Sequence, residues 1–150
     1  MGQFTLTTEF SGSAERLREL LGTPGMFEEI TDPDMEFELV AAPPEVAEGE
    51  EITFAIVTGG IRQILRHCWT TVNELLIVAE QVEGPTQSWQ HTQRIAATPG
   101  GCSLTDSITF EPPGGVLGFM VTEDAIAASL EQSTGVRHRL IAQHLNAQPA

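Results

Sequence analysis

The 150-residue sequence predicts an α+β fold in which a curved antiparallel sheet of about seven strands wraps around one long C-terminal helix. Short segments in which apolar and polar residues alternate recur over much of the chain, as is typical of strands with one buried face. Two short helical segments follow the first of these strands, and a helical pattern of 25 residues comes last. A sheet that buries one face needs a cover, and only the long helix is large enough to provide it.

The first half of the chain begins with a strand and two short helices. Alternation over residues 4–10 predicts the strand. Ser13 is a favourable N-cap for the first helix, which we expect to end at Gly22. Pro24 suits the first position of a second short helix, which we expect to end near Ile30.

Four more strands are predicted before the hairpin, at residues 35–39, 52–56, 61–72 and 75–82. A loop rich in Pro and Glu, residues 42–51, and a glycine turn at residues 58–60 separate them. The strand at 61–72 can face either way. One parity places Leu65, His67 and Trp69 inward, and the other places Ile64, Cys68 and Thr70 inward.

The sixth and seventh strands form a hairpin around the turn-forming residues 98–101. The predicted inner face of this hairpin carries Trp89, His91, Gln93, Ile95, Leu104, Asp106, Ile108 and Phe110. His91, Gln93 and Asp106 interrupt this otherwise apolar face. Burying these polar groups without partners would cost a few kcal/mol each. They must therefore bond one another, hold water or line a cavity.

The last helix is predicted over residues 122–146, a length of about 37 Å. Its apolar stripe is formed by Ile126, Leu130, Arg137, Ile141 and Leu145, so it includes one charged residue. Gly135 is a weak point in the middle, at a cost of about 1 kcal/mol relative to Ala.

The charge balance excludes several classes of function. The chain has 21 acidic residues against seven Arg, a formal net charge of −14, with the acids densest at residues 45–51. Such a chain repels phosphate backbones and anionic membrane surfaces, so we expect no nucleic-acid partner. The simplest interpretation is a solubilising surface charge, and the alternative is an acid-rich docking surface.

Targeting signals and disulfides are not expected. No apolar run approaches the ~20 residues that span a bilayer, and the N-terminus lacks the basic start of a secretory signal, so we expect no membrane insertion. Cys68 and Cys102 are too few for a disulfide framework. A cytoplasmic location with reduced thiols is therefore the expectation.

Beyond this order of elements, the sequence resembles the SRPBCC superfamily, the START or Bet v-like (birch-pollen-allergen-like) helix-grip proteins. It is most similar to the bacterial polyketide cyclase-like or "cell division inhibitor-like" group. The resemblance rests on Glu80-Gln81, Gly84-Pro85, Trp89-x-His91-Thr92, Gly100-Gly101, Thr105-Asp106 and Pro113-x-Gly115-x-Leu117-Gly118. It implies a single domain over residues 1–150, with a hydrophobic ligand cavity beneath the long helix and no defined reaction.

Three positions matter in comparing the chain with that group. Arg137 falls where the group usually has an Arg in its final helix. Gln93 replaces the second His of the usual Trp-x-His-Thr-His motif, and Ala79 stands where Asp is common. These two departures weaken any mechanism based on paired histidines or on acid-base chemistry, and they leave the fold prediction unchanged.

His91 and Asp106 form the sharpest candidate constellation. Cross-strand neighbours on one face lie about 4.5–5.5 Å apart and diagonal ones about 7–8 Å, so the carboxylate can orient the imidazole. The pair can fix the register of the hairpin, orient a ligand, or act as an acid-base couple.

The predicted ligand-binding residues are Phe54, Trp69, Trp89, His91, Gln93, Asp106, Ile108, Phe110, Met120 and Arg137. The aromatic residues among them can equally be plain core. Phe119 and Met120 either form a lid or pack against the end of the sheet. Arg137 either pairs with an inward acid such as Asp106 or caps the cavity against an anionic ligand.

Neither a metal nor another cofactor is expected. The Cys and His residues that could ligate a metal are Cys68, Cys102, His67, His91, His138 and His144. Only His138 and His144 approach a usual ligand spacing. Neither Cys has a cationic neighbour in the sequence that would favour a nucleophilic thiolate.

Three functions remain in order of preference. The first is a carrier or sensor of a small hydrophobic molecule, lipid-like or aromatic. The second is an enzyme of the cyclase, dehydratase or hydrolase type that uses His91 and Asp106 as an acid-base pair. The third is a regulatory interaction module that uses the acidic loop at residues 45–51. The oligomeric state stays open, and a homodimer is one possibility.

Overall fold

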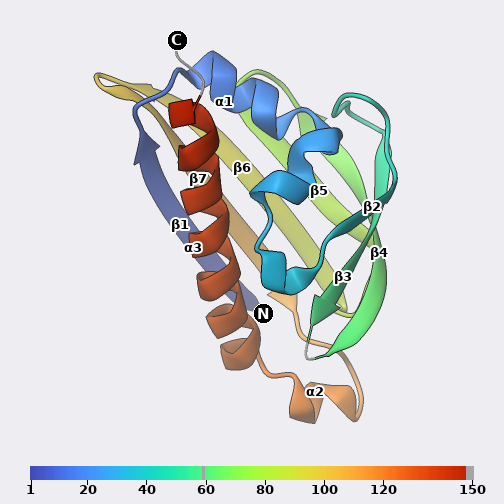
Figure 1. Cartoon of the computed structure of the whole chain (residues 1–150). Helices are drawn as coiled ribbons and strands as arrows, with labels where there is room; N and C mark the ends of the chain where they lie inside the picture. Colours follow the sequence, from blue (N-terminus) through green and yellow to red (C-terminus); the bar gives the residue numbers. More distant parts are fainter. Residues whose placement is uncertain (59, 148–150) are drawn as a thin grey trace.

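The computed structural model describes residues 1–58 and 60–147, in which seven antiparallel strands form one sheet that curves around a long helix (Figure 1). The strand order is β1-β7-β6-β5-β4-β3-β2. The α+β prediction is confirmed, including the two short helical segments after the first strand. Of the predicted turn at residues 58–60, Gly59 lies outside the described residues.

The element bounds follow the predicted order closely. The strands are β1 (Gly2–Phe10), β2 (Glu38–Ala41), β3 (Glu51–Thr58), β4 (Ile61–Val72), β5 (Leu76–Glu83), β6 (Ser88–Thr98) and β7 (Gly101–Glu111). The α-helices are α1 (Ala14–Leu21), α2 (Leu117–Met120) and α3 (Glu123–Ala147), and the 3₁₀ segments are η1 (Pro24–Ile30) and η2 (Pro33–Met35).

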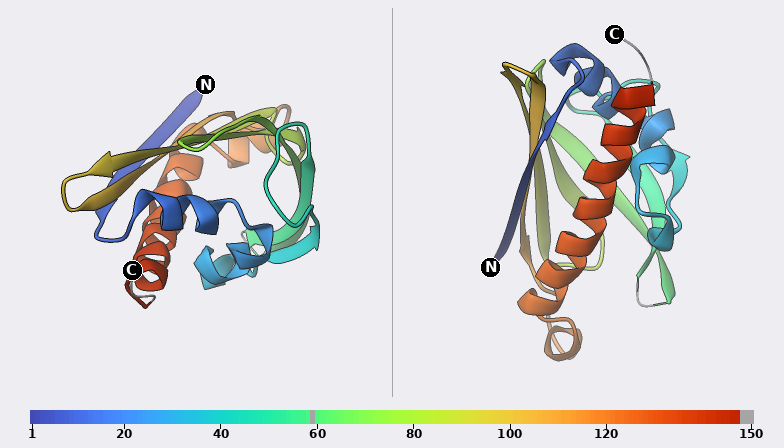
Figure 2. Two further views of the ribbon diagram at one scale, coloured as in Figure 1. Left: turned by 90° about the horizontal axis from the view of Figure 1, so that it is seen from above. Right: turned by 60° about the vertical axis from the view of Figure 1, so that its left-hand side comes forward.

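Helix α1 has the ends that its sequence predicts. The Ser13 hydroxyl accepts a hydrogen bond from the Arg16 amide at 3.2 Å, which satisfies one free amide of the first turn. The Gly22 amide donates to the Arg18 carbonyl at 2.9 Å and closes the last turn. The helix buries its leucine side and packs over β6 and β7 at one end of the grip (Figure 2).

The second predicted strand begins later than the sequence pattern indicates. Residues 35–39 were expected to be extended, but η2 extends to Met35 and β2 starts at Glu38. Asp32 accepts a hydrogen bond from the Asp34 amide at 2.9 Å, and this cap stabilises η2. Glu36 then adopts a left-handed conformation with φ 46°, which turns the chain before it can pair.

The facing of β4, left open by its sequence, is settled by ion pairs on the outer surface. Arg66 contacts Glu51 at 2.9 Å and Glu83 at 2.6 Å on the neighbouring strands. Because side chains alternate along a strand, these outward contacts direct His67 and Trp69 to the inner face. Both inward residues are buried.

The β6–β7 hairpin has the predicted turn and the predicted faces. Thr98 pairs with Gly101, so Pro99 and Gly100 form the tip. Gln93 lies directly opposite Asp106, which makes His91 a diagonal neighbour of that carboxylate. Every second residue of β7 is buried, so Asp106 points into the grip.

Helix α3 lies along the inner face, nearest to β1 and η1 (Figures 1 and 2). Its inward side buries Leu130, Ile141 and Leu145, and Gly135 does not interrupt it. No helix in the described ranges is both long enough and apolar enough to cross a bilayer.

The buried apolar residues form two clusters. The larger one, beneath α1 and the C-terminal end of α3, includes Phe10, Leu17, Leu21, Trp69, Ile77, Ile95, Leu104 and Ile141. The smaller one consists of Ile108, Phe110 and Leu130, with Phe4, Trp89 and Ile126 packed against it. On β7, Leu104 belongs to the first cluster and Ile108 to the second. Asp106 stands between them, so a polar layer separates the two apolar regions.

Candidate functional site

The polar layer is organised around the carboxylate of Asp106, which is 0% exposed. His91 Nε2 lies 2.7 Å from Oδ1. Arg137 Nη1 and His138 Nε2, both from α3, each lie 2.5 Å from Oδ2. Strand β6, strand β7 and helix α3 therefore meet at one buried anion.

Electrostatics keep this carboxyl group ionised. Burial alone would raise the pKa of Asp106, but the Arg137 charge, the His91 ring and the hydrogen bond from His138 outweigh burial. The pKa therefore lies well below the ordinary 3.8. An ionised carboxylate only accepts hydrogen bonds, so both histidines donate to it from Nε2.

The two histidines differ in what remains available to other molecules. His138 is 3% exposed, and its Nδ1 lies 2.7 Å from the Thr8 hydroxyl, which donates to it. His91 is 22% exposed in its side chain, and its Nδ1 has no hydrogen bond to any described residue. His138 is thus saturated and ties α3 to β1, whereas the Nδ1 of His91 is free to form a hydrogen bond with another molecule.

Arg137 forms an ion pair with the inward acid Asp106, which was one of the two roles predicted for it. Besides its contact with Asp106, its Nη2 donates to Gln93 Oε1 at 2.7 Å. Its side chain is 19% exposed. The Asp106 carboxylate neutralises its charge, which disfavours the alternative role as a cap for an anionic ligand.

The predicted apolar and aromatic binding residues of the sheet divide into core and rim. Trp69, Ile108 and Phe110 are at most 4% exposed and belong to the packed clusters. Trp89 is half-buried, with its ring centroid 5.9 Å from that of Phe110. Phe54 is also half-buried on β3, so Trp89 and Phe54 are the aromatic residues of the set that a ligand can reach.

The prediction that Met120 lines the ligand site is wrong, because its side chain does not lie on the inner face. It is 77% exposed and Phe119 is 88% exposed, so neither packs against the end of the sheet. The Pro-Gly segment at residues 112–115 carries the chain away from the sheet, and α2 projects beyond its end (Figure 1).

His67 is an inward residue that sequence reasoning did not include in the site. Burial, followed by the effect of His91, lowers the pKa of His67 from 6.5 to about 4. Its Nε2 is buried and has no hydrogen-bond partner in the described chain. The Phe54 and His67 rings are nearly perpendicular, with centroids 5.1 Å apart. Its inward position depended on the facing of β4, which the sequence left open.

His138 and Thr8 were also missed as members of the polar layer. The sequence suggested His138 only as a metal ligand, because it lies beside the apolar stripe of the last helix. Thr8 shares the inward parity of Phe4 and Phe10, and this was the signal that could have identified it. Within residues 1–58 and 60–147, no three His, Cys, Asp or Glu side chains are arranged to hold a metal ion.

The thiols lie apart from this layer. Cys102 is 0% exposed, and burial raises the pKa of its thiol. Cys68 faces outward with the other parity of β4, and its thiol contacts the Trp69 carbonyl at 3.7 Å.

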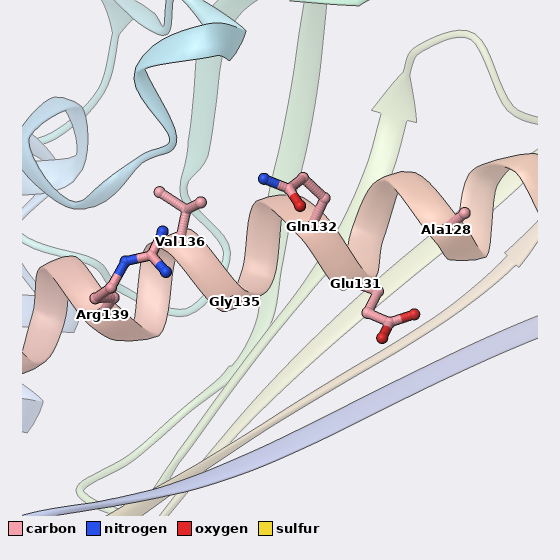
Figure 3. Close-up of a pocket in the computed structure, with 6 residues that line it drawn as sticks. All are labelled: Ala128, Glu131, Gln132, Gly135, Val136 and Arg139. Carbon is pink, nitrogen blue, oxygen red and sulfur yellow. The ribbon is translucent and has the colours of Figure 1, made fainter.

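Two surface hollows of about 400 and 160 Å³ lie away from the inner face. The larger one follows the outer side of α3 and is lined by Ala128, Glu131, Gln132, Gly135, Val136 and Arg139 (Figure 3). The smaller one lies between α1 and the end of α3, near Leu20 and His144. Neither is the cavity beneath the helix that the resemblance implies.

Comparisons with known proteins identify the fold. A scan against protein-family models gave no match, and no curated protein sequence matched. Among solved structures, a Rhodobacter sphaeroides protein has 15% identity and a TM-score of 0.74, over 99% of this chain and 94% of its own.

Two further solved structures have assigned names. The di-domain ARO/CYC StfQ from the steffimycin biosynthetic pathway has 15% identity and a TM-score of 0.78, over 97% of this chain and 50% of its own. Ara h 8.0201 has 14% identity and a TM-score of 0.67, over 97% of this chain and 98% of its own. At these identities the likeness establishes a shared fold.

Proposed function

We propose that this chain, which has the helix-grip fold of the SRPBCC superfamily, binds a small and mainly apolar molecule between α3 and the inner face of the sheet, as a carrier or sensor. The observation that carries the proposal is the free Nδ1 of His91. It belongs to a partly exposed imidazole whose other nitrogen is held by a buried carboxylate. Such a hydrogen-bonding group fixes the orientation of a ligand that is bound mainly through contacts with apolar side chains.

The energetics of the polar layer support a functional role. Replacing a buried ion pair by apolar side chains of similar volume is often neutral or stabilising. Apolar side chains in place of both Asp106 and Arg137 would therefore serve the stability of the fold about as well as the ion pair does, whereas removing one partner alone would not. Their arrangement does fix the orientation of His91 and its tautomer, which matters for recognising a hydroxyl or amide donor.

Acid-base catalysis is the second candidate function. The 2.7 Å contact between His91 Nε2 and Asp106 Oδ1 is the geometry in which a carboxylate orients a general base. StfQ, whose name describes an ARO/CYC, shares the fold. We rank this candidate second because Gln93, in place of a second histidine, supplies no proton and accepts its hydrogen bond from Arg137.

The acidic loop gains no specific support as a docking surface. The Val46 amide donates to the Gly22 carbonyl at 2.9 Å, and Glu48 accepts a bond from the Val72 amide at 3.3 Å. These contacts give the loop a role within the fold.

Native mass spectrometry of the freshly purified chain tests whether it carries a small molecule. We expect a bound mass that solvent extraction removes, and uptake of 2-naphthol by the extracted protein. Retention of the bare mass in both preparations, together with no uptake of 2-naphthol, would contradict the proposal.

A pair of variants tests where 2-naphthol binds. We expect His91→Phe to weaken its binding about fivefold, the value of one typical hydrogen bond. Gln132→Ala alters the outer hollow of α3 and should leave the affinity unchanged. The reverse pattern would place the site on the outside of the helix.

The enzyme alternative is tested on the compound that extraction releases. If the protein converts this compound, loss of turnover in His91→Ala would favour catalysis over carriage. Unchanged turnover in that variant would remove the acid-base role.

A further inference from the structure

We infer that the inner face carries a second hydrogen-bonding position at His67, across the sheet from His91, and that the bound molecule is uncharged with polar groups on two opposite edges. This inference rests on the proposed function and makes it more specific. It assigns a role to a buried imidazole that the Asp106 layer does not use.

Two inward residues of β4, Gln63 and His67, each have a buried polar atom without a hydrogen-bond partner among the described residues, and His67 is the one that lies nearer to the polar layer. It is 9% exposed, and its Nε2 has neither solvent contact nor a hydrogen bond to a described residue. Its cross-strand neighbour Gln81 does not supply one. Both polar atoms of the Gln81 amide are engaged by Thr86, at 2.7 and 3.0 Å. A buried nitrogen of this kind costs free energy until a partner reaches it.

A short side chain, Ala79, lies on the diagonal between the two imidazoles. Ala79 on β5 pairs with Trp69 on one side and with His91 on the other. His67 lies two residues from Trp69 on the same face of β4. Strands β4 and β6 are two strand spacings apart, about 10 Å. Ala79 lies directly between Trp69 and His91, and His67 is opposite Gln81. Ala79 is therefore a short side chain on the diagonal from His67 to His91, over which a planar molecule can lie.

The charges around this position favour an uncharged molecule. His67 is neutral at pH 7 because burial lowers its pKa to about 4. The positive charge of Arg137 is paired with Asp106. A ligand carboxylate would therefore find no free cation here, and a ligand ammonium would face the paired Arg137. A hydroxyl or amide group can bond to either imidazole without a charge being buried.

The rim beside His67 can adapt to such a molecule. The Phe54 ring is nearly perpendicular to the His67 ring and stacks on Phe37, with the Phe54 and Phe37 centroids 5.4 Å apart. Both phenylalanines are half-buried. A ligand that reaches His67 Nε2 requires the Phe54 ring to move aside, and the two phenylalanine rings then continue the apolar wall beside the ligand.

Three probes that share one ring system test this inference: naphthalene, 2-naphthol and 2,6-dihydroxynaphthalene. We expect the dihydroxy compound to bind about fivefold more tightly than 2-naphthol at pH 7, because it can bond to both imidazoles. In His67→Phe this preference should disappear while naphthalene binds as before. The control His144→Phe, which changes an imidazole outside the inner face, should keep the preference.

The outcomes separate the inference from the proposed function. Binding of naphthalene with no preference for the second hydroxyl, or a preference that survives His67→Phe, overturns the inference and leaves the proposed function standing. Failure of all three probes to bind overturns both.

Ala79→Leu is a second variant that leaves both imidazoles in place. It should weaken all three probes at least tenfold by filling the space over this position. Unchanged affinities in a folded Ala79→Leu protein would also overturn the inference.

Discussion

Asp106 determines the polarity of the inner face, because each of its oxygens holds a group from another element. His91 forms a hydrogen bond with Oδ1, and two residues of α3, Arg137 and His138, both form hydrogen bonds with Oδ2. The carboxylate thus sets which nitrogen of His91 carries the proton. The charge of Asp106 and the neutral state of His67 both affect the stability of the chain.

Asp106→Asn should destabilise the chain by about 3 kcal/mol at pH 7, because it leaves Arg137 without its counter-ion in a mostly buried place. Urea unfolding measures the change. The surface variant Glu131→Gln, on the outer side of α3, should stay within about 0.5 kcal/mol of the parent chain. A loss for Asp106→Asn no larger than this control would show that the ion pair contributes little.

Stability should fall between pH 6.5 and pH 4 because of His67. Its pKa is 6.5 when unfolded and about 4 when folded, so in this window the unfolded chain takes up a proton that the folded chain does not. The sign is a loss as pH falls, of about 2–3 kcal/mol between pH 7 and pH 4.5. The stabilisation from Asp106 is lost only below the ordinary pKa of 3.8, so the two windows separate.

The matched variants for this pH effect are His67→Gln and His144→Gln. The first should flatten the slope of unfolding free energy against pH in that window. The second should keep the slope of the parent chain. Equal slopes in His67→Gln and the parent would contradict a neutral, buried His67.

At the residue scale, the sequence predicts part of this layer. Alternation and turn position were enough to place His91, Gln93 and Asp106 on one face, since strand periodicity is a local property. His138 could not be assigned in the same way. Its contact depends on the rotation of α3 against the sheet, which distant side chains fix. The position of His67 depended on the parity of β4, which the outward ion pairs of Arg66 with β3 and β5 determine.

At the element scale, local signals defined the helices better than the start of β2. Ser13 and Gly22 carry cap chemistry that acts over one turn, so α1 was predictable. The start of β2 depends on a left-handed residue at Glu36, a non-glycine position that the sequence gives no reason to expect. Helix α3 was predictable in length because its stripe repeats over several turns.

Gly135→Ala should stabilise α3 by about 1 kcal/mol, the difference in helix propensity between the two residues. An added Cβ there meets no atom within 4 Å, so the gain is not offset by a clash. At Gly2 the same change would place a Cβ 2.3 Å from the ring of Phe110 and should destabilise the chain. Thermal unfolding that shifts both variants in one direction would contradict this packing.

At the scale of the whole molecule, the number and order of elements were enough to predict the grip. A one-sided sheet has few ways to bury its apolar face, and one long helix narrows them further. The division of the core into two apolar clusters with a polar layer between them was not predictable. It requires knowing which residues of α3 meet β7. The surface hollows lie outside the grip, so binding at the inner face requires rim groups such as Phe54 to move.

The most direct test of the central claim is a crystal structure of the solvent-extracted protein soaked with 2-naphthol. We predict ligand density between α3 and strands β5 and β6, with its hydroxyl within hydrogen-bonding distance of His91 Nδ1. Density confined to the outer hollow of α3, with the inner face filled by protein side chains alone, would contradict the account.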